Sequence, residues 1–176
     1  MKFLMLTACC LSLLGGGVLN ADGLSVYGSY WNPDEGDDSY GVGLQVRGGG
    51  ELVYFEALGT YYEDITQEFT LIDYELSVIP FDLGLGLRFD ASPATELYAG
   101  LGGTYFLLDS NVGDSDDRVG YYLKAGCEVE INENMGISVE AMWRDAEARV
   151  TDDGDFEENR FNLDGLALHV GLVFLW

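Results

Sequence analysis

The chain has 176 residues, enough for one domain, and its 31 acidic against 8 basic residues give a formal net charge of −23. So much negative charge excludes electrostatic binding of nucleic acid or of any other anionic surface. Because 48% of the residues are hydrophobic, the chain is not a disordered acidic segment either. It combines 24 glycines and 11 tyrosines with only 3 prolines, which is typical of a β protein with crowded positions.

Residues 1–21 have the features of a secretory signal peptide. Lys2 is followed by an apolar run over residues 3–19, and Ala21 is small enough for the position before the cleaved bond. We therefore expect a signal peptide at residues 1–21 and a single mature domain at residues 22–176.

Two alternatives to a cleaved signal have to be weighed against it. A membrane-spanning helix needs roughly 20 apolar residues, more than this run provides, and glycines occupy positions 15–17. The Leu-Thr-Ala-Cys sequence at 6–9 resembles a lipoprotein processing box, but it follows only about four apolar residues, fewer than a signal core normally has. If the signal is removed, Cys127 is the one remaining thiol, and no internal disulfide can form.

From residue 24 onward, apolar residues alternate with small or polar ones in eight segments that are separated by turn signals. The predicted strands are 24–31, 40–47, 51–62, 73–89, 96–108, 119–131, 135–149 and 161–176. Their connections alternate strictly between long acidic segments and short turns. The long ones are 32–39, 63–72, 109–118 and 150–160, and the short ones are 48–50, 90–95 and 132–134. A barrel with tight turns at one end and longer loops at the other has this arrangement, whereas a sandwich has no reason to keep its long loops together.

Each predicted strand has one face of large apolar residues and one face of small or polar residues. The polar faces carry both signs of charge: Arg47, Arg88, Lys124 and Arg144 against Glu56, Asp82, Glu128, Glu130 and Glu140. Buried charges are costly unless they are paired and hydrogen-bonded, and these side chains can pair if they share one interior. We therefore predict that the polar faces line the inside of a barrel and that the apolar faces meet lipid. The alternative is a set of exposed salt bridges on a soluble sheet.

Aromatic residues gather at the ends of the predicted strands. Next to the long loops lie Tyr30, Trp31, Tyr40, Tyr61, Tyr62, Tyr105, Phe106, Tyr121, Tyr122 and Phe161, and at the opposite ends lie Phe89, Phe174 and Trp176. Since amphipathic rings favour the headgroup level of a bilayer, we expect two aromatic belts. Pro80 lies within the fourth predicted strand, where it cannot donate to the ladder, so it marks either a bulge or a turn that would change the strand count.

The last predicted strand reads FNLDGLALHVGLVFLW, with large apolar residues at alternate positions and small ones between them. It resembles the C-terminal strand of bacterial outer-membrane β-barrels, which closes on an aromatic residue. In that family this strand is the assembly signal, which the resemblance places at Val170, Leu172, Phe174 and Trp176.

Over residues 24–176 the whole pattern resembles the eight-stranded outer-membrane barrels of the OmpA/OmpX type. The resemblance implies an all-β fold, an eight-stranded antiparallel up-and-down transmembrane β-barrel in the bacterial outer membrane. It also implies outer-membrane lipid, lipopolysaccharide and the barrel assembly machinery as partners, with no nucleic acid among them.

The acidic loops are weak candidates for binding divalent cations, since carboxylate oxygens are the ligands that Ca²⁺ prefers. The weak metal candidates are Asp152, Asp153 and Asp155. None of the loops has the spacing of an EF-hand, and a solvated acidic surface is the simpler interpretation. We predict no cofactor apart from such possible loop-bound divalent cations.

His169 is the single histidine, and the alternation places it on the inner face in mid-strand. Acyl-transfer chemistry would need a nucleophile within hydrogen-bond reach of it. No serine motif accompanies the histidine, and Ser138 is merely a possible neighbour. We therefore assign His169 to the interior charge network and predict no catalytic residue.

Together these observations predict a non-enzymatic outer-membrane barrel that presents acidic surface loops, in an envelope-structural or surface-interaction role. The interior of eight strands is about wide enough for side chains to fill it, so we expect no large pore. The alternatives are a narrow cation-preferring channel lined by the inner carboxylates and, less expected, a lipid-modifying enzyme that uses His169.

Overall fold

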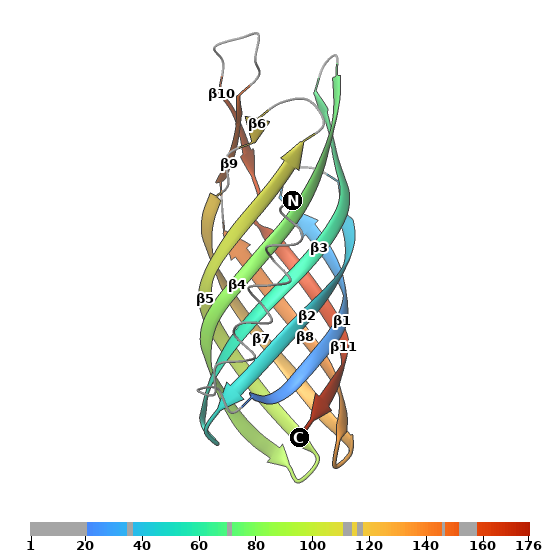
Figure 1. Ribbon diagram of the computed structural model, residues 1–176, viewed down its shortest axis with the longest axis vertical. Helices are drawn as coiled ribbons and strands as arrows, with labels where there is room; N and C mark the ends of the chain where they lie inside the picture. Colours follow the sequence, from blue (N-terminus) through green and yellow to red (C-terminus); the bar gives the residue numbers. More distant parts are fainter. Residues whose placement is uncertain are drawn as a thin grey trace.

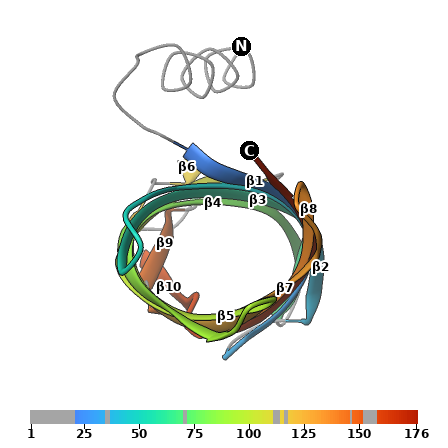
Figure 2. The same ribbon diagram turned by 90° about the horizontal axis from the view of Figure 1, so that it is seen from below.

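Eight antiparallel strands form a closed barrel in the computed structural model, which describes residues 21–34, 37–69, 72–110, 114–115, 118–145, 147–151 and 158–176 (Figures 1 and 2). The strands are β1 (Ala21–Pro33), β2 (Ser39–Gly49), β3 (Val53–Phe69), β4 (Ile72–Ser92), β5 (Thr95–Ser110), β7 (Arg118–Asn132), β8 (Met135–Asp145) and β11 (Gly165–Leu175). β1 pairs with both β2 and β11, which closes the barrel. The predicted eight-stranded antiparallel barrel is thus confirmed. No helix among the described residues is long and apolar enough to cross a membrane.

The two ends of the barrel differ, as the loop lengths predict. The short turns β2–β3, β4–β5 and β7–β8 lie at the lower end in Figure 1. Three further strands, β6 (Asp114–Ser115), β9 (Glu147–Thr151) and β10 (Glu158–Asn162), form a separate small sheet at the other end.

Three of the predicted long loops are corrected by this structure. The hairpin of β3 and β4 continues to the pair Phe69↔Ile72, so most of the predicted loop 63–72 is strand. The third predicted loop contains β6, and the fourth contains the end of β9 and the beginning of β10. The rest of β9 belongs to the predicted strand 135–149 and the rest of β10 to the predicted strand 161–176, so both predicted strands extend beyond the barrel wall. These three strands form the small sheet at the loop end and are not part of the closed barrel (Figure 1).

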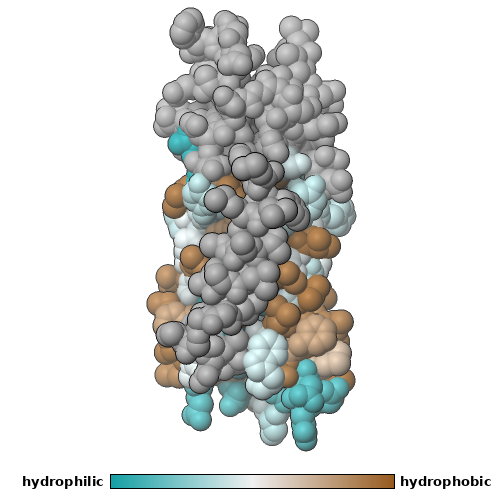
Figure 3. Space-filling view, viewed as in Figure 1, coloured by the Kyte–Doolittle hydropathy of each residue, from teal (hydrophilic) through white to brown (hydrophobic). Residues whose placement is uncertain are grey.

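The wall of the barrel carries its large apolar side chains on the outside. Leu83 and Leu101, for example, are 63% and 61% exposed, while the residues beside them in each strand face inward. Figure 3 shows hydrophobic residues over much of the visible wall and hydrophilic residues at its lower end. An apolar surface of this extent needs an apolar surrounding, which a lipid bilayer provides.

Inward-facing tyrosines lie flat over glycines of the neighbouring strand. Four such pairs stand directly opposite each other in the register: Tyr27↔Gly43, Tyr54↔Gly86, Tyr98↔Gly126 and Tyr122↔Gly102. A Cβ atom added at any of these glycines would collide with the tyrosine ring. The glycines therefore make room for large rings inside a narrow barrel, which explains why the inner face combines glycine with aromatic residues.

Pro80 lies inside β4 and does not change the strand count. It pairs with Phe106 of β5 on one side, but on the other side the β3–β4 partners run from Gly59↔Phe81 directly to Tyr62↔Val78. A proline has no N–H to donate, so the ladder is interrupted locally on that side.

Candidate functional site

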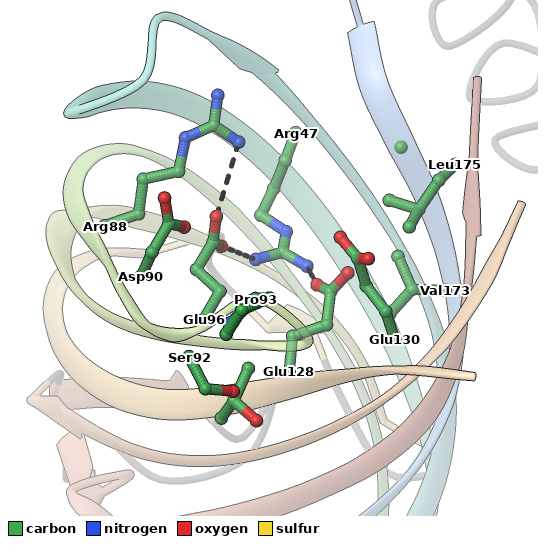
Figure 4. Close-up of a pocket in the computed structure, with 12 residues that line it drawn as sticks. Arg47, Arg88, Asp90, Ser92, Pro93, Glu96, Glu128, Glu130, Val173 and Leu175 are labelled. Carbon is green, nitrogen blue, oxygen red and sulfur yellow. Dashed lines mark hydrogen bonds and ion pairs between the residues drawn. The ribbon is translucent and has the colours of Figure 1, made fainter. Parts of the chain in front are cut away.

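The inside of the barrel holds a chain of charged and aromatic side chains, and it begins at the end with the short turns. There Arg47 forms an ion pair with Glu128, and its Nη1 atom lies 3.6 Å from Oε1 of Glu96. Glu96 also faces Nη1 of Arg88 at 3.8 Å, while Arg88 donates hydrogen bonds to the carbonyl oxygen of Gly50. These residues line a pocket of about 130 Å³ at the mouth of the barrel, which we call the mouth pocket (Figure 4).

A second group of charges, the central cluster, surrounds Lys124. Its ammonium group is paired with Glu56 and lies 2.6 Å from Oε2 of Glu140. Glu56 also accepts hydrogen bonds from the Gln45 side chain at 3.0 Å and from the Tyr122 hydroxyl at 2.7 Å. All five side chains are buried, so each charge has its partners within the lumen.

A third group lies around Asp82, which is completely buried. Nη2 of Arg144 lies 2.7 Å from Oδ2 of Asp82, and the Thr104 hydroxyl donates to Oδ1 at 2.6 Å. Removing charges from water costs several kcal/mol per ion, and close oppositely charged partners with further hydrogen bonds offset that cost. The pairing explains how a polar interior can be stable inside a membrane protein.

Toward the loop end from Glu140 on β8 and from Thr104 on β5, the lumen holds an apolar layer. This layer, which we call the aromatic plug, consists of Trp31, Tyr62, Val78, Phe106 and Met142, all completely buried. The ring centroids of Trp31 and Tyr62 are 5.0 Å apart, and those of Trp31 and Phe106 are 6.4 Å apart. The Tyr62 hydroxyl lies 2.6 Å from Oγ of Ser29, which fixes the plug to β1.

Most of the predicted interior residues lie in this network. The structure buries Arg47, Glu56, Asp82, Lys124, Glu128, Glu140, Arg144 and His169. Arg88 is only partly exposed and lies at the mouth. Glu130 differs from the prediction: it is exposed and lines the mouth pocket, outside the buried network, because it lies near the end of β7 where the barrel opens.

The other predicted site residues divide into two groups. Val170, Leu172, Phe174 and Trp176 point outward from β11 and from the residue after it, on the lipid-facing surface. Asp152, Asp153 and Asp155 lie outside the described residues. Among the residues that are described, no group of three or more His, Cys, Asp or Glu side chains is arranged to hold a metal ion.

The sequence analysis missed Glu96 and the inward tyrosines, and it placed part of the aromatic belt wrongly. Trp31, Tyr62, Phe106 and Tyr122 are buried inside the barrel, whereas Tyr40, Tyr61, Tyr105 and Tyr121 are exposed on its surface. The sequence contains the information needed to separate the two groups, because adjacent residues of a strand must face opposite sides of the sheet. Adjacent aromatics such as Tyr61 and Tyr62 therefore cannot both belong to one belt.

His169 lies in a row of three side chains that extends over three neighbouring strands. It stands directly opposite Ser29 of β1 and opposite Glu140 of β8, and its Nδ1 atom is 2.9 Å from Oε1 of Glu140. The order serine, histidine, carboxylate resembles that of a hydrolase triad. However, all three side chains are buried, the Ser29 hydroxyl is engaged with Tyr62, and the ring of Tyr27 stacks on His169 at 4.6 Å.

A closed barrel with an apolar wall and a paired, polar lumen defines the class of transmembrane β-barrels. The model of the family "Outer membrane protein beta-barrel domain" matches residues 11–174. The chain therefore belongs to this family, and its place is the bacterial outer membrane. No curated protein matches the chain.

Several solved outer-membrane proteins are similar in fold. Neisserial surface protein A superposes with a TM-score of 0.63 at 10% identity and covers 88% of this chain and 95% of its own. Ail, the attachment invasion locus protein of Yersinia pestis, superposes with a TM-score of 0.56 at 12% identity and covers 89% of this chain and 97% of its own. Outer Membrane Protein W of E. coli superposes with a TM-score of 0.57 at 15% identity and covers 90% of this chain and 100% of its own. Ail has also been solved in complex with the heparin analogue sucrose octasulfate. At these identities the likeness concerns the fold alone.

Proposed function

We propose that this protein is a non-enzymatic, closed barrel that anchors acidic loops at the cell surface and serves envelope structure or surface interaction. The observation that carries this proposal is the filled lumen. The Arg47–Glu128 pair at the mouth pocket, the two further ion-pair groups around Lys124 and Asp82, and the aromatic plug occupy the interior of the barrel. With a filled lumen, the barrel acts through its outer wall and its loops.

The chemistry of the loops limits what they can bind. Asp34, Asp37 and Asp38 in the first loop are exposed, and the net charge of the whole chain is −23. A polysulfated ligand such as the one bound to Ail would be repelled by this charge. We infer that a loop partner is cationic, or that it binds through divalent cations that bridge carboxylates to the phosphates of lipopolysaccharide.

Conductance of the purified barrel in a planar lipid bilayer tests the closed lumen. We expect no steady conductance from the unaltered protein. In the double variant Trp31→Ala with Phe106→Ala, two of the five plug side chains are truncated, and we expect brief openings to become detectable. Trp143→Ala, which changes an outward-facing ring of similar size, is the matched control and should stay closed. A steady conductance of the unaltered protein would contradict the proposal.

A narrow cation-preferring channel is the second candidate, and one observation favours it. The mouth pocket contains the carboxylates of Asp90, Glu96, Glu128 and Glu130 but only the two guanidinium groups of Arg47 and Arg88, so it attracts cations. If the unaltered protein conducts, a cation preference that Glu130→Gln reduces would support the channel. A conductance that this variant leaves unchanged would argue against a pathway through the pocket.

A further inference from the structure

The mouth pocket carries an excess of negative charge at the seam where the barrel closes. Its lining comes from six strands and includes Gly23 of β1, Glu130 of β7, and Val173 and Leu175 of β11. Gly23 stands opposite Leu175 in the β1–β11 register, so the pocket reaches the pair of strands that complete the barrel. A group attached to the start of β1 therefore lies at the rim of this pocket.

The carboxylates of the pocket do not share its cations equally. Arg47 is engaged by Glu128 and Glu96, and Arg88 by Glu96 and the Gly50 carbonyl. Figure 4 shows Glu130 on the opposite side of the Arg47–Glu128 pair from Arg88, beside Val173 and Leu175. Among the residues that the structure describes, neither guanidinium group forms an ion pair with Glu130, and a further cation at the β11 side of the pocket would balance its charge.

The register of β1 indicates where such a cation arises. The β1–β2 partners shift between Ala21 and Gly23, so Asp22 is the extra residue of a bulge immediately before the pocket-lining glycine. The extra residue of a bulge is left out of the regular pairing, and Asp22 directly precedes Gly23, which lines the pocket. Hydrolysis of the peptide bond after Ala21 adds water across that bond, leaves a carboxylate on Ala21 and converts the nitrogen of Asp22 into an α-ammonium group.

We propose that removal of a signal peptide after Ala21 places the α-ammonium group of Asp22 at the mouth pocket, where Glu130 binds it and ties β1 to β7 across the closing seam. The ion pair between the α-ammonium group and Glu130 would then form only after processing, because the precursor has an uncharged amide at this position. Among the side chains that the structure describes, the other charged groups that line the pocket are Asp90 of β4, Glu96 of β5, Glu128 of β7, Arg47 of β2 and Arg88 of β4.

The chain offers a clean readout of this amine. It contains only two lysines, Lys2 and Lys124, and removal of residues 1–21 leaves Lys124 alone. The ammonium group of Lys124 is buried and held by Glu56 and Glu140. In the mature folded barrel, an amine-reactive ester therefore labels the α-amine almost exclusively.

The experiment uses the mature protein isolated from the outer-membrane fraction. Its intact mass should show a chain that begins at Asp22. Only the neutral form of the amine reacts with the ester, and a carboxylate paired with the amine favours its charged form. Glu130→Gln removes that carboxylate, so a larger fraction of the amine is neutral and labelling at pH 7 should be faster. An exposed ion pair of ordinary strength corresponds to an acceleration of about two- to fivefold. Asp90→Asn removes an exposed carboxylate that lines the same pocket and is the matched control, for which we expect an unchanged rate.

Three results would overturn the proposal. One is a mature chain that begins more than a residue away from Asp22, since its amine would not lie at the rim of the pocket. Another is an unchanged labelling rate in Glu130→Gln, which would show that a different group holds the amine. The third is an equal acceleration in Asp90→Asn, which would reduce the effect to the general charge of the pocket. Glu130 is exposed, so its replacement should leave folding intact, and the heat-dependent gel mobility of each variant checks this.

Discussion

The Nδ1 atom of His169 lies 2.9 Å from Oε1 of Glu140 on the neighbouring strand β8. Ser29 of β1 stands directly opposite the same histidine on its other side. The row resembles a catalytic triad in order but not in surroundings. Glu140 is shared with Lys124, and the plug lies between this row and the loop end. These contacts support the proposal of a non-enzymatic barrel in which His169 belongs to the interior network.

The first prediction is that His169→Gln changes stability and not chemistry. Loss of the hydrogen bond to a buried carboxylate should lower the free energy of unfolding by about 1–3 kcal/mol, as measured by urea titration in detergent micelles. The lipid A composition of cells that carry the variant, measured by mass spectrometry, should match that of cells with the unaltered protein. A change in lipid A acylation that Ser29→Ala reproduces would establish an enzyme instead.

The second prediction concerns the central cluster. Lys124→Met removes the cation that Glu56 and Glu140 share, and it leaves two buried carboxylates without that partner. We expect the free energy of unfolding to fall by about 3–5 kcal/mol. Asp90→Asn, an exposed carboxylate at the mouth, should change it by about 0.5 kcal/mol or less.

The double variant Lys124→Met with Glu56→Gln separates pairing from packing. If the loss arises from uncompensated charge, neutralising Glu56 should restore part of it, so the two effects will not add. Additive losses would mean that the Lys124 side chain contributes mainly by filling space.

The alternation of side chains was sufficient to predict the barrel wall. It located eight strands, their inner and outer faces and the end with the short turns, because a lipid-facing wall requires an apolar residue at every second position. It could not predict which inner charges meet. Arg47 and Glu128, for example, are 81 positions apart in the sequence, and their contact depends on the stagger of five strands.

Two parts of the interior were missed for different reasons. Glu96 is the second residue of β5 and lies beside a turn, so only the residues that follow it show the alternation that would place it on the inner face. The inward tyrosines were hidden because a tyrosine suits both a membrane surface and a crowded lumen. Only the glycine opposite each ring, such as Gly86 opposite Tyr54, distinguishes the two positions, and that pairing depends on the register.

The third prediction tests the tyrosine–glycine pairs. A methyl group at Gly86 would collide with the ring of Tyr54, so Gly86→Ala must displace a side chain that is completely buried. We expect a loss of about 1–3 kcal/mol in the free energy of unfolding. Gly28→Ala is the matched control, because an added Cβ there meets nothing within 4 Å, and its stability should be unchanged. Equal stabilities of the two variants would show that the lumen has room for the ring to move.

The last prediction tests the lipid-facing wall. Leu101 lies in the middle of β5 and points outward, and Leu101→Arg should cost about 2–4 kcal/mol in a lipid bilayer, where a charge meets hydrocarbon. Val119 is also exposed on the outer face but lies at the loop end of β7, near the headgroups. Val119→Arg should therefore cost about 1 kcal/mol or less. Urea unfolding of both variants in lipid vesicles measures the difference. If the protein were a soluble periplasmic barrel, both arginines would face water, and the two variants would be equally stable. Equal stability of the two variants in vesicles would therefore contradict the assignment of this face to lipid.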